Sequence, residues 1–178
     1  MKPAAVLLVA AAAWAQVPVE TVALGTTAER PAVSQAVMTD LEKQLDKKVS
    51  MVGGNDPIQL LGLARGVYVK GFGVVITQEI SLVQTPFPNP FRQSITPLEA
   101  AQIHKRKLER LPLVRQTVHQ LWMVAAAALN TMPDNDQIVV AVRLLYQEWE
   151  DTKGLPGLLV VKATRRDGLA GNLQTGEQ

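Results

Sequence analysis

Three acidic residues lie close together near the end of an apolar run, where the sequence EWED places Glu148, Glu150 and Asp151 around a tryptophan. Neighbouring carboxylates can carry out acid and base chemistry or bind calcium. If the preceding strand pattern continues, alternation sends Glu148 and Glu150 to the same face. The spaced oxygen ligands of a calcium-binding loop are missing, so a solvated turn is favoured and the cluster remains a candidate site.

The two histidines, His104 and His119, are the remaining side chains suited to metal binding or proton transfer. On one unbroken helix their separation corresponds to about 22 Å, too far to share an ion. The chain has no cysteine, which excludes thiolate ligands and thiol catalysis. The sequence therefore predicts no metal site and no cofactor.

Sequence motifs of hydrolases are absent, because no serine stands in a G-x-S-x-G elbow and neither S-x-x-K nor H-E-x-x-H occurs. An enzymatic function would require residues from distant segments, such as Glu79, His119 and Glu148, to come together. The sequence favours a non-catalytic protein.

The glycines of RGVYVKGFGVVITQEISLV raise the question of a nucleotide loop. A dinucleotide fingerprint requires a third glycine and a helix after the loop, and a phosphate-binding loop requires Gly-Lys-Ser/Thr. Here Gly71, Phe72 and Gly73 are followed by an alternating, β-branched run. These three residues are therefore predicted to form the turn of a β-hairpin.

A proline-rich segment from Gln84 to Pro97 follows the hairpin. Its prolines exclude a central strand, and a loop of this length in a small domain is often functional. Phe87, Phe91 and Arg92 are its candidate partner-binding residues. The alternative is that the phenylalanines cover the sheet edge.

A basic run on the following helix is interpreted as an exposed, solvated face. Docking to an acidic protein or an anionic membrane surface is the alternative. The run comprises Lys105, Arg106, Lys107, Arg110 and Arg115.

The elements that would position these residues follow from periodicity. Four-residue spacing from Val33 predicts a helix that ends near Ser50, and a long helix begins at the N-cap Thr96, with a kink or a break at Pro112. Strands are predicted at 66–69, at 74–83, at 137–149 and at 158–165.

We therefore predict a two-layer α+β sandwich in the order α-β-β-α-β-β, with four mostly antiparallel strands. The order resembles that of roadblock and profilin-like α/β sandwiches, a likeness of topology that carries no function. The domain is expected to span residues 33–165, after a leader at 16–32 and before a flexible tail at 166–178.

Residues 1–15 have the pattern of a signal peptide: Lys2, an apolar core, and Ala13 to Ala15 as a cleavage site. The apolar run is too short to span a bilayer. Its removal takes one base and no acid from 18 basic and 16 acidic residues, leaving a chain close to neutral. An exported, near-neutral protein in the periplasm or outside the cell is expected, without a nucleic-acid partner.

The Ala-rich N-terminus, RGVYVKGFGVVIT and HKRKLERLPLVRQ together with YQEWEDTKGLP carry a resemblance. They resemble a group of uncharacterised exported proteins of soil bacteria with a G-V-Y-x-x-G-[FY]-G hairpin. The resemblance implies export and a shared fold, and no activity.

The function expected from the sequence is that of an exported module that binds a protein partner or assembles with itself. A small-ligand sensor, with its ligand between sheet and helices, is the second hypothesis. A hydrolase that uses carboxylates near Glu148 is the third.

Overall fold

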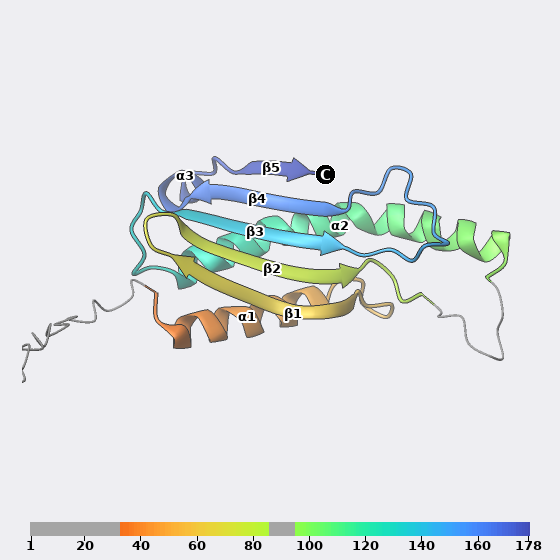
Figure 1. Cartoon of the computed structure of the whole chain (residues 1–178), viewed down its shortest axis with the longest axis horizontal. Coiled ribbons are helices and arrows are strands. Elements are labelled where there is room, and N and C mark those ends of the chain that lie inside the picture. The colour runs from red at the N-terminus through yellow and green to blue at the C-terminus, as the bar shows by residue number, and fades with distance from the viewer. Residues whose placement is uncertain (1–32, 86–94) are drawn as a thin grey trace, which may run out of the picture.

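A five-stranded sheet with helices on one of its faces makes up the fold (Figure 1). The computed structural model describes residues 33–85 and 95–178. The predicted signal peptide and leader, and the loop residues Phe87, Phe91 and Arg92, lie outside the described residues. The mixed α+β class predicted from the sequence is confirmed.

The strands lie side by side in chain order, and every neighbouring pair is antiparallel except β2 and β3. Those two are parallel because α2 returns the chain along the sheet between them. Their bounds are β1 Gln59–Val69, β2 Gly73–Ser81, β3 Gln137–Leu144, β4 Leu158–Thr164 and β5 Gln174–Glu177; the helices are α1 Gln35–Ser50, α2 Pro97–Ala128 and α3 Arg165–Leu169.

Both long helices begin at the polar caps that local chemistry favours. Ser34 accepts a hydrogen bond from the backbone N–H of Val37, and Thr96 and Glu99 form a reciprocal capping box ahead of Pro97. The helix α2 continues through Pro112, so of the two expected alternatives, a kink or a break, the break does not occur. Burial of Leu111 and Val114 on either side of Pro112 holds the helix against the core despite the missing hydrogen bond.

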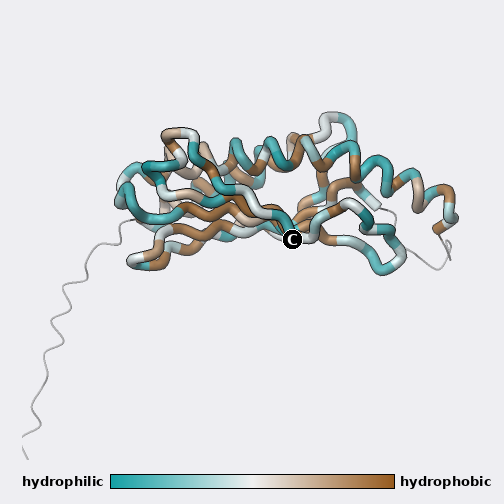
Figure 2. The backbone as a smooth tube through the Cα atoms, turned by 90° about the horizontal axis from the view of Figure 1, so that it is seen from above, coloured by the Kyte–Doolittle hydropathy of each residue, from teal (hydrophilic) through white to brown (hydrophobic). Residues whose placement is uncertain are grey.

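The core fills the space between the sheet and the helices. Inward-facing side chains of β2, β3 and β4 meet the apolar stripes of α1 and α2, and Trp122 is fully buried among them. The indole Nε1 of Trp122 donates a hydrogen bond of 2.9 Å to the carbonyl oxygen of Ile138, so the one polar atom of this side chain is satisfied. Except for β5, the strands contain long apolar stretches, and hydrophobic residues are brown in Figure 2.

The helix α1 also covers the outer edge of β1. Carboxylate oxygens of Asp46 and Glu42 accept hydrogen bonds from the backbone N–H groups of Ala64, at 2.8 Å, and Gly66, at 2.7 Å. Asp46 accepts a further hydrogen bond from Gln78. These edge amides are therefore not available to another strand.

The C-terminal residues form elements that the sequence did not predict. Residues 166–178, expected as a flexible tail, continue α3 and contain β5, so the sheet has five strands and not four. The guanidinium of Arg115 holds the carboxylate of Glu177 at 2.5 and 2.8 Å, and His119 contacts the hydroxyl of Thr175 at 3.1 Å. Side-chain contacts to α2 thus fix a strand that has no apolar alternation.

Alanine substitutions at Gly71 and Gly73 test two separate requirements for glycine in the hairpin turn, a positive φ and the close approach of another strand. Both glycines have positive φ, at 80° and 129°, but a Cβ at Gly73 would lie 1.9 Å from the carbonyl oxygen of Gln137, whereas Gly71 faces open space. We expect Gly73→Ala to lower the free energy of unfolding by about 3 kcal/mol or more, and Gly71→Ala by about 1 kcal/mol. Urea unfolding measures both values, and equal losses would contradict the close approach of β2 and β3.

Acidification should release β5 before the rest of the sheet. The hydrogen bonds from Arg115 hold the pKa of Glu177 below its usual range. The stabilisation of β5 by this ion pair is therefore fully present above the ordinary carboxyl pKa of about 4, and it is lost as the pH falls through the lowered pKa. We expect hydrogen-exchange protection of the β5 amides, corrected for intrinsic rates, to fall in that window. In Glu177→Gln the protection of the β5 amides should be weak and independent of pH in that window. The control Glu148→Gln should keep the wild-type pH profile. A wild-type profile in Glu177→Gln would contradict the role of the Arg115–Glu177 pair.

Candidate functional site

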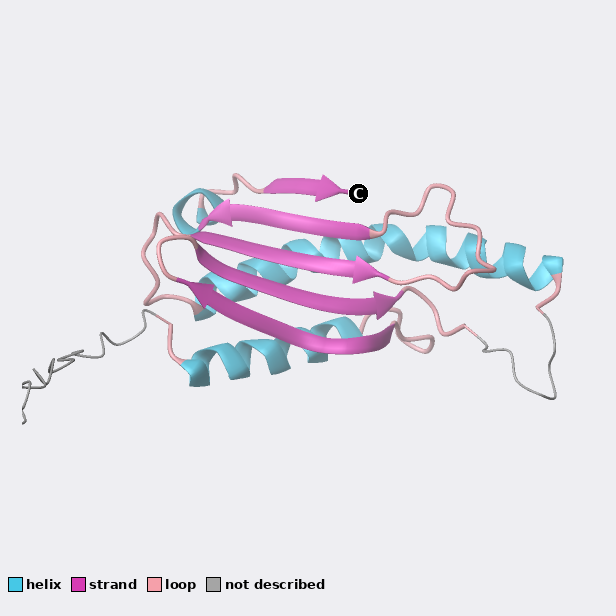
Figure 3. Cartoon of the chain, in the orientation of Figure 1, coloured by secondary structure: helices cyan, strands magenta, loops and turns pink. Residues whose placement is uncertain are grey.

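One face of the sheet is left uncovered by the described helices and loops. Figure 3 shows the strands in front and the helices α1 and α2 behind or beside them. Because side chains alternate along a strand, one set of residues points away from the core. On the four long strands this outward set comprises Leu63, Arg65, Val67 and Val69; Val75, Thr77 and Glu79; Val139, Ala141 and Arg143; and Leu158, Val160 and Lys162.

Most of these outward side chains are apolar, which is unusual for the solvent face of a sheet. Leu63, Val67 and Val69 on β1 are 57%, 55% and 46% exposed. An antiparallel strand with one solvated face normally alternates apolar and polar residues. A contiguous apolar surface on a protein marks a site of contact with another molecule.

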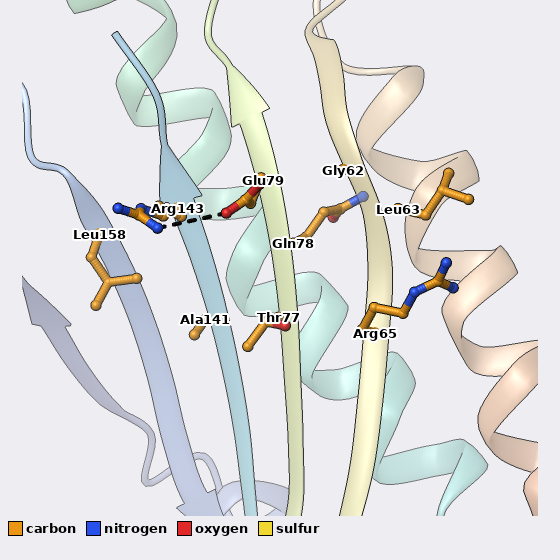
Figure 4. Close-up of a pocket in the computed structure, with 9 residues that line it drawn as sticks. All are labelled: Gly62, Leu63, Arg65, Thr77, Gln78, Glu79, Ala141, Arg143 and Leu158. Atoms are coloured by element: carbon orange, nitrogen blue, oxygen red, sulfur yellow. Dashed lines mark ion pairs between the residues drawn. The ribbon is translucent and has the colours of Figure 1, made fainter.

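A row of charges crosses the same face near one end of the strands. Glu79 and Arg143 are register partners on β2 and β3, and their side chains form an ion pair at 3.7 Å (Figure 4). Arg65 on β1 lies 4.0 Å from Glu42 of α1. Glu79 and Arg143 are 47% and 64% exposed, so their pairing in the free protein contributes little to stability.

A shallow hollow of about 570 Å³ lies beside this row (Figure 4). Thr77 and Ala141 line it with short side chains, and Leu63, Arg65 and Arg143 line it with long ones. The pairing of β1 with β2 shifts register between Gly62 and Arg65, which is an irregularity of the kind that bends a strand. The hollow opens on the uncovered face and not between sheet and helices, where the second hypothesis from the sequence expected a ligand.

The hairpin glycines lie at the opposite end of this face. Gly71 and Phe72 turn the chain between β1 and β2, and Val69 pairs with Gly73. The backbone N–H of Gln137 donates a 2.7 Å hydrogen bond to the carbonyl oxygen of Phe72, which ties the turn to the start of β3. The Phe72 side chain is exposed.

The predicted acidic cluster is dispersed. The strand β3 ends at Leu144, five residues earlier than the pattern predicted, so alternation does not bring Glu148 and Glu150 together. Glu148 is exposed, the side chain of Glu150 is enclosed, and the backbone carbonyl of Asp151 contacts Nδ1 of His104 at 2.8 Å.

Glu150 forms an enclosed ion pair with Lys107 of α2. The two side chains are 3% and 1% exposed, and the ammonium lies 4.9 Å from the ring centroid of Tyr146. Burial lowers the pKa of Lys107, against the opposing effect of the hydrogen bond and charge of Glu150. Burial and the Glu150 charge raise the pKa of Tyr146. With both charges enclosed, the pair fastens the loop after β3 to α2.

Sequence reasoning treated Lys107 as part of a solvated basic face. The signal that it is buried was its position, because Ile103, Lys107, Leu111 and Val114 fall on one helical stripe. Other members of the basic run are engaged too: Arg106 and Arg110 both contact the carboxylate of Asp56.

The histidines lie apart, His104 beside Asp151 and His119 beside Thr175. Within residues 33–85 and 95–178, no three potential ligand side chains gather in a way that would hold a metal ion. No helix in these residues is long and apolar enough to cross a membrane. No family model, characterised protein or solved structure matches the chain.

Removing both members of the buried pair should cost less than the two single losses added together. Lys107→Met leaves a buried carboxylate without its partner, and we expect a loss of about 3 to 5 kcal/mol in the free energy of unfolding. Glu150→Gln should also destabilise, and the double variant should lose less than the sum of the two. Lys105→Met on the exposed side of the same helix should change stability by under about 0.5 kcal/mol. Additive losses in the unfolding cycle would contradict the pairing.

Proposed function

We propose that this protein is an exported, non-catalytic α+β module that binds a protein through the uncovered face of its sheet. The apolar character of that face carries the proposal. Leu63, Val67 and Val69 are roughly half exposed, and Val75, Val139 and Val160 extend the apolar surface across the sheet. Covering a side chain that is already half buried is worth about 1 kcal/mol, so a partner that covers several gains substantial affinity.

The form of the face supports a protein partner. It extends over four strands, and Glu79 and Arg143 lie together towards one end of the two central strands (Figure 4), whereas Lys162 lies in the row of Val75 and Val139. Protein interfaces combine an apolar centre with polar groups at the rim. Charges such as Glu79 and Arg143 would then fix the orientation of the partner more than the strength of binding.

Export is part of this proposal and is supported by the signal-peptide pattern of residues 1–15. The face would then meet its partner in the periplasm or outside the cell. A contribution of Phe87, Phe91 and Arg92 to binding stays a prediction.

A small-ligand function is the second candidate, favoured by the hollow of about 570 Å³ and by the two guanidinium groups at its border. Its volume falls in the range of ligand pockets. Arg65 and Arg143 would select an anionic ligand, such as a carboxylate or phosphate.

Site-specific photo-crosslinking tests the proposed contact. A photoreactive residue at Val67, on the uncovered face, should crosslink to a protein in the native host, because Val67 is 55% exposed and lies within the apolar surface. The control position is Leu113 on α2, which is apolar and 48% exposed but lies on a helix of the other layer. We expect crosslinks at Val67 and few at Leu113.

Equal crosslinking at both positions, or none at Val67, would contradict a protein-binding face. A thermal shift with small anions that is lost in Arg143→Gln, without crosslinks at Val67, would favour the second candidate.

A further inference from the structure

We infer that the partner of the uncovered face is a second copy of this chain, packed face to face about a twofold axis that runs parallel to the strands between β2 and β3. The inference rests on the proposed function and names its partner. The pairing of the two central strands carries it.

The strands β2 and β3 are parallel and in register, so their outward residues form straight rows across the sheet. The rows pair Val75 with Val139, Thr77 with Ala141, and Glu79 with Arg143. Both strands run in the same direction, so a half-turn about an axis that is parallel to them and midway between them places β2 of the second copy opposite β3 of the first. Each row of residues keeps its position along the strands. Each residue on β2 then faces its row partner on β3 of the second copy.

This exchange matches apolar with apolar residues at the centre. Val75 faces Val139 of the second copy, and the short side chains of Thr77 and Ala141 face each other, which lets the two sheets approach closely. On the outer strands, Leu63 of β1 comes opposite Leu158 of β4, because both flank the row of Glu79 and Arg143.

The exchange also matches opposite charges. Glu79 of each copy faces Arg143 of the other, which adds two crossed ion pairs to the two already present within the copies. The four groups form an alternating ring near the end of the strands, at the rim of the interface. An axis perpendicular to the strands, through the row of Thr77 and Ala141, would instead place Glu79 against Val75 and leave the carboxylate facing an apolar surface.

The remaining cations face apolar residues of the second copy. By register, Arg65 of β1 comes opposite Val160 of β4, and Lys162 of β4 comes opposite Val67 of β1; both cations are exposed in the free chain. Long basic side chains can lay their aliphatic stems over apolar neighbours while the charged group reaches water. Arg65 keeps Glu42 as its counter-charge.

The size of the face suits a dimer. Four strands spaced by about 4.8 Å and eight residues long cover about 19 by 26 Å, so two copies would bury roughly 1,000 Å² in total. This is near the smallest area expected of a biological interface, about 1,000 Å², and is typical of a reversible dimer. A twofold axis makes the contact self-complementary and closed.

Charge reversal tests the dimer with an internal rescue. The chain, expressed with its own N-terminus, should form dimers in sedimentation equilibrium. Glu79→Arg and Arg143→Glu each place like charges opposite each other twice, and each should weaken dimerisation at least about tenfold. Mixing the two variants should restore a heterodimer, because each then supplies the charge that the other lacks, and the double variant Glu79→Arg/Arg143→Glu should dimerise with itself.

Thermal melts show whether each variant is folded. The mixture of Glu79→Arg and Arg143→Glu still tests the crossed ion pairs if one variant alone is less stable, because heterodimer formation is measured directly. A wild-type chain that stays monomeric, or Glu79→Arg that dimerises as the wild type does, would overturn the inference. Crosslinks from Val67 to a different protein would also overturn it, while leaving the proposed function intact. Absence of both dimer and crosslinks would reject both.

Discussion

The parallel pairing of β2 with β3 sets the arrangement of the rest of the molecule. Parallel neighbours need a long connection, and α2 supplies it by running back along the sheet. The same crossing places α2 beside α1 on one face and brings Trp122 into the core. The opposite face is left with the apolar residues that support a role in binding. The register between these two strands also aligns Glu79 with Arg143. The pairing of the strands therefore decides which charged side chains are neighbours on the surface.

The position of α1 is fixed by polar contacts as well as by packing. Met38, Leu41 and Leu45 bury the apolar side of the helix, and Glu42 and Asp46 bind the edge amides of β1. Hydrogen bonds from backbone N–H groups to carboxylates are stronger than those between neutral groups. A helix that would otherwise only cover the core is therefore also attached to the side of the sheet.

Local chemistry in the sequence was sufficient for the features that depend on neighbouring residues. Thr96 predicted the start of α2 as its N-cap, and the glycines at 71 and 73 predicted a turn, because caps and turns are determined within a few residues. The general α+β class followed from the order of the periodic segments. These predictions needed no knowledge of long-range contacts.

Features that depend on distant partners were missed. The enclosure of the Glu150 side chain follows from its contact with Lys107, 43 positions earlier, which a charged run concealed, and β3 ends at Leu144, before the acidic residues. The strand β5 depends on Arg115 and His119 of α2, and its own residues carry no strand pattern. The uncovered face was also not foreseen, because a strand that is apolar on both sides resembles a central, fully covered strand.

The two edges of the sheet differ in a way that limits how many copies can associate. Ala64 and Gly66 direct their amides to carboxylates of α1, whereas β5 is a short, exposed edge strand. Edge-to-edge growth of a sheet into a fibre requires a receptive edge strand on both sides of every subunit. With one side occupied, strand addition can join at most a pair of β5 edges and then stops. Association through the apolar face can therefore stop at a pair of chains, because strand addition does not extend it into a fibre.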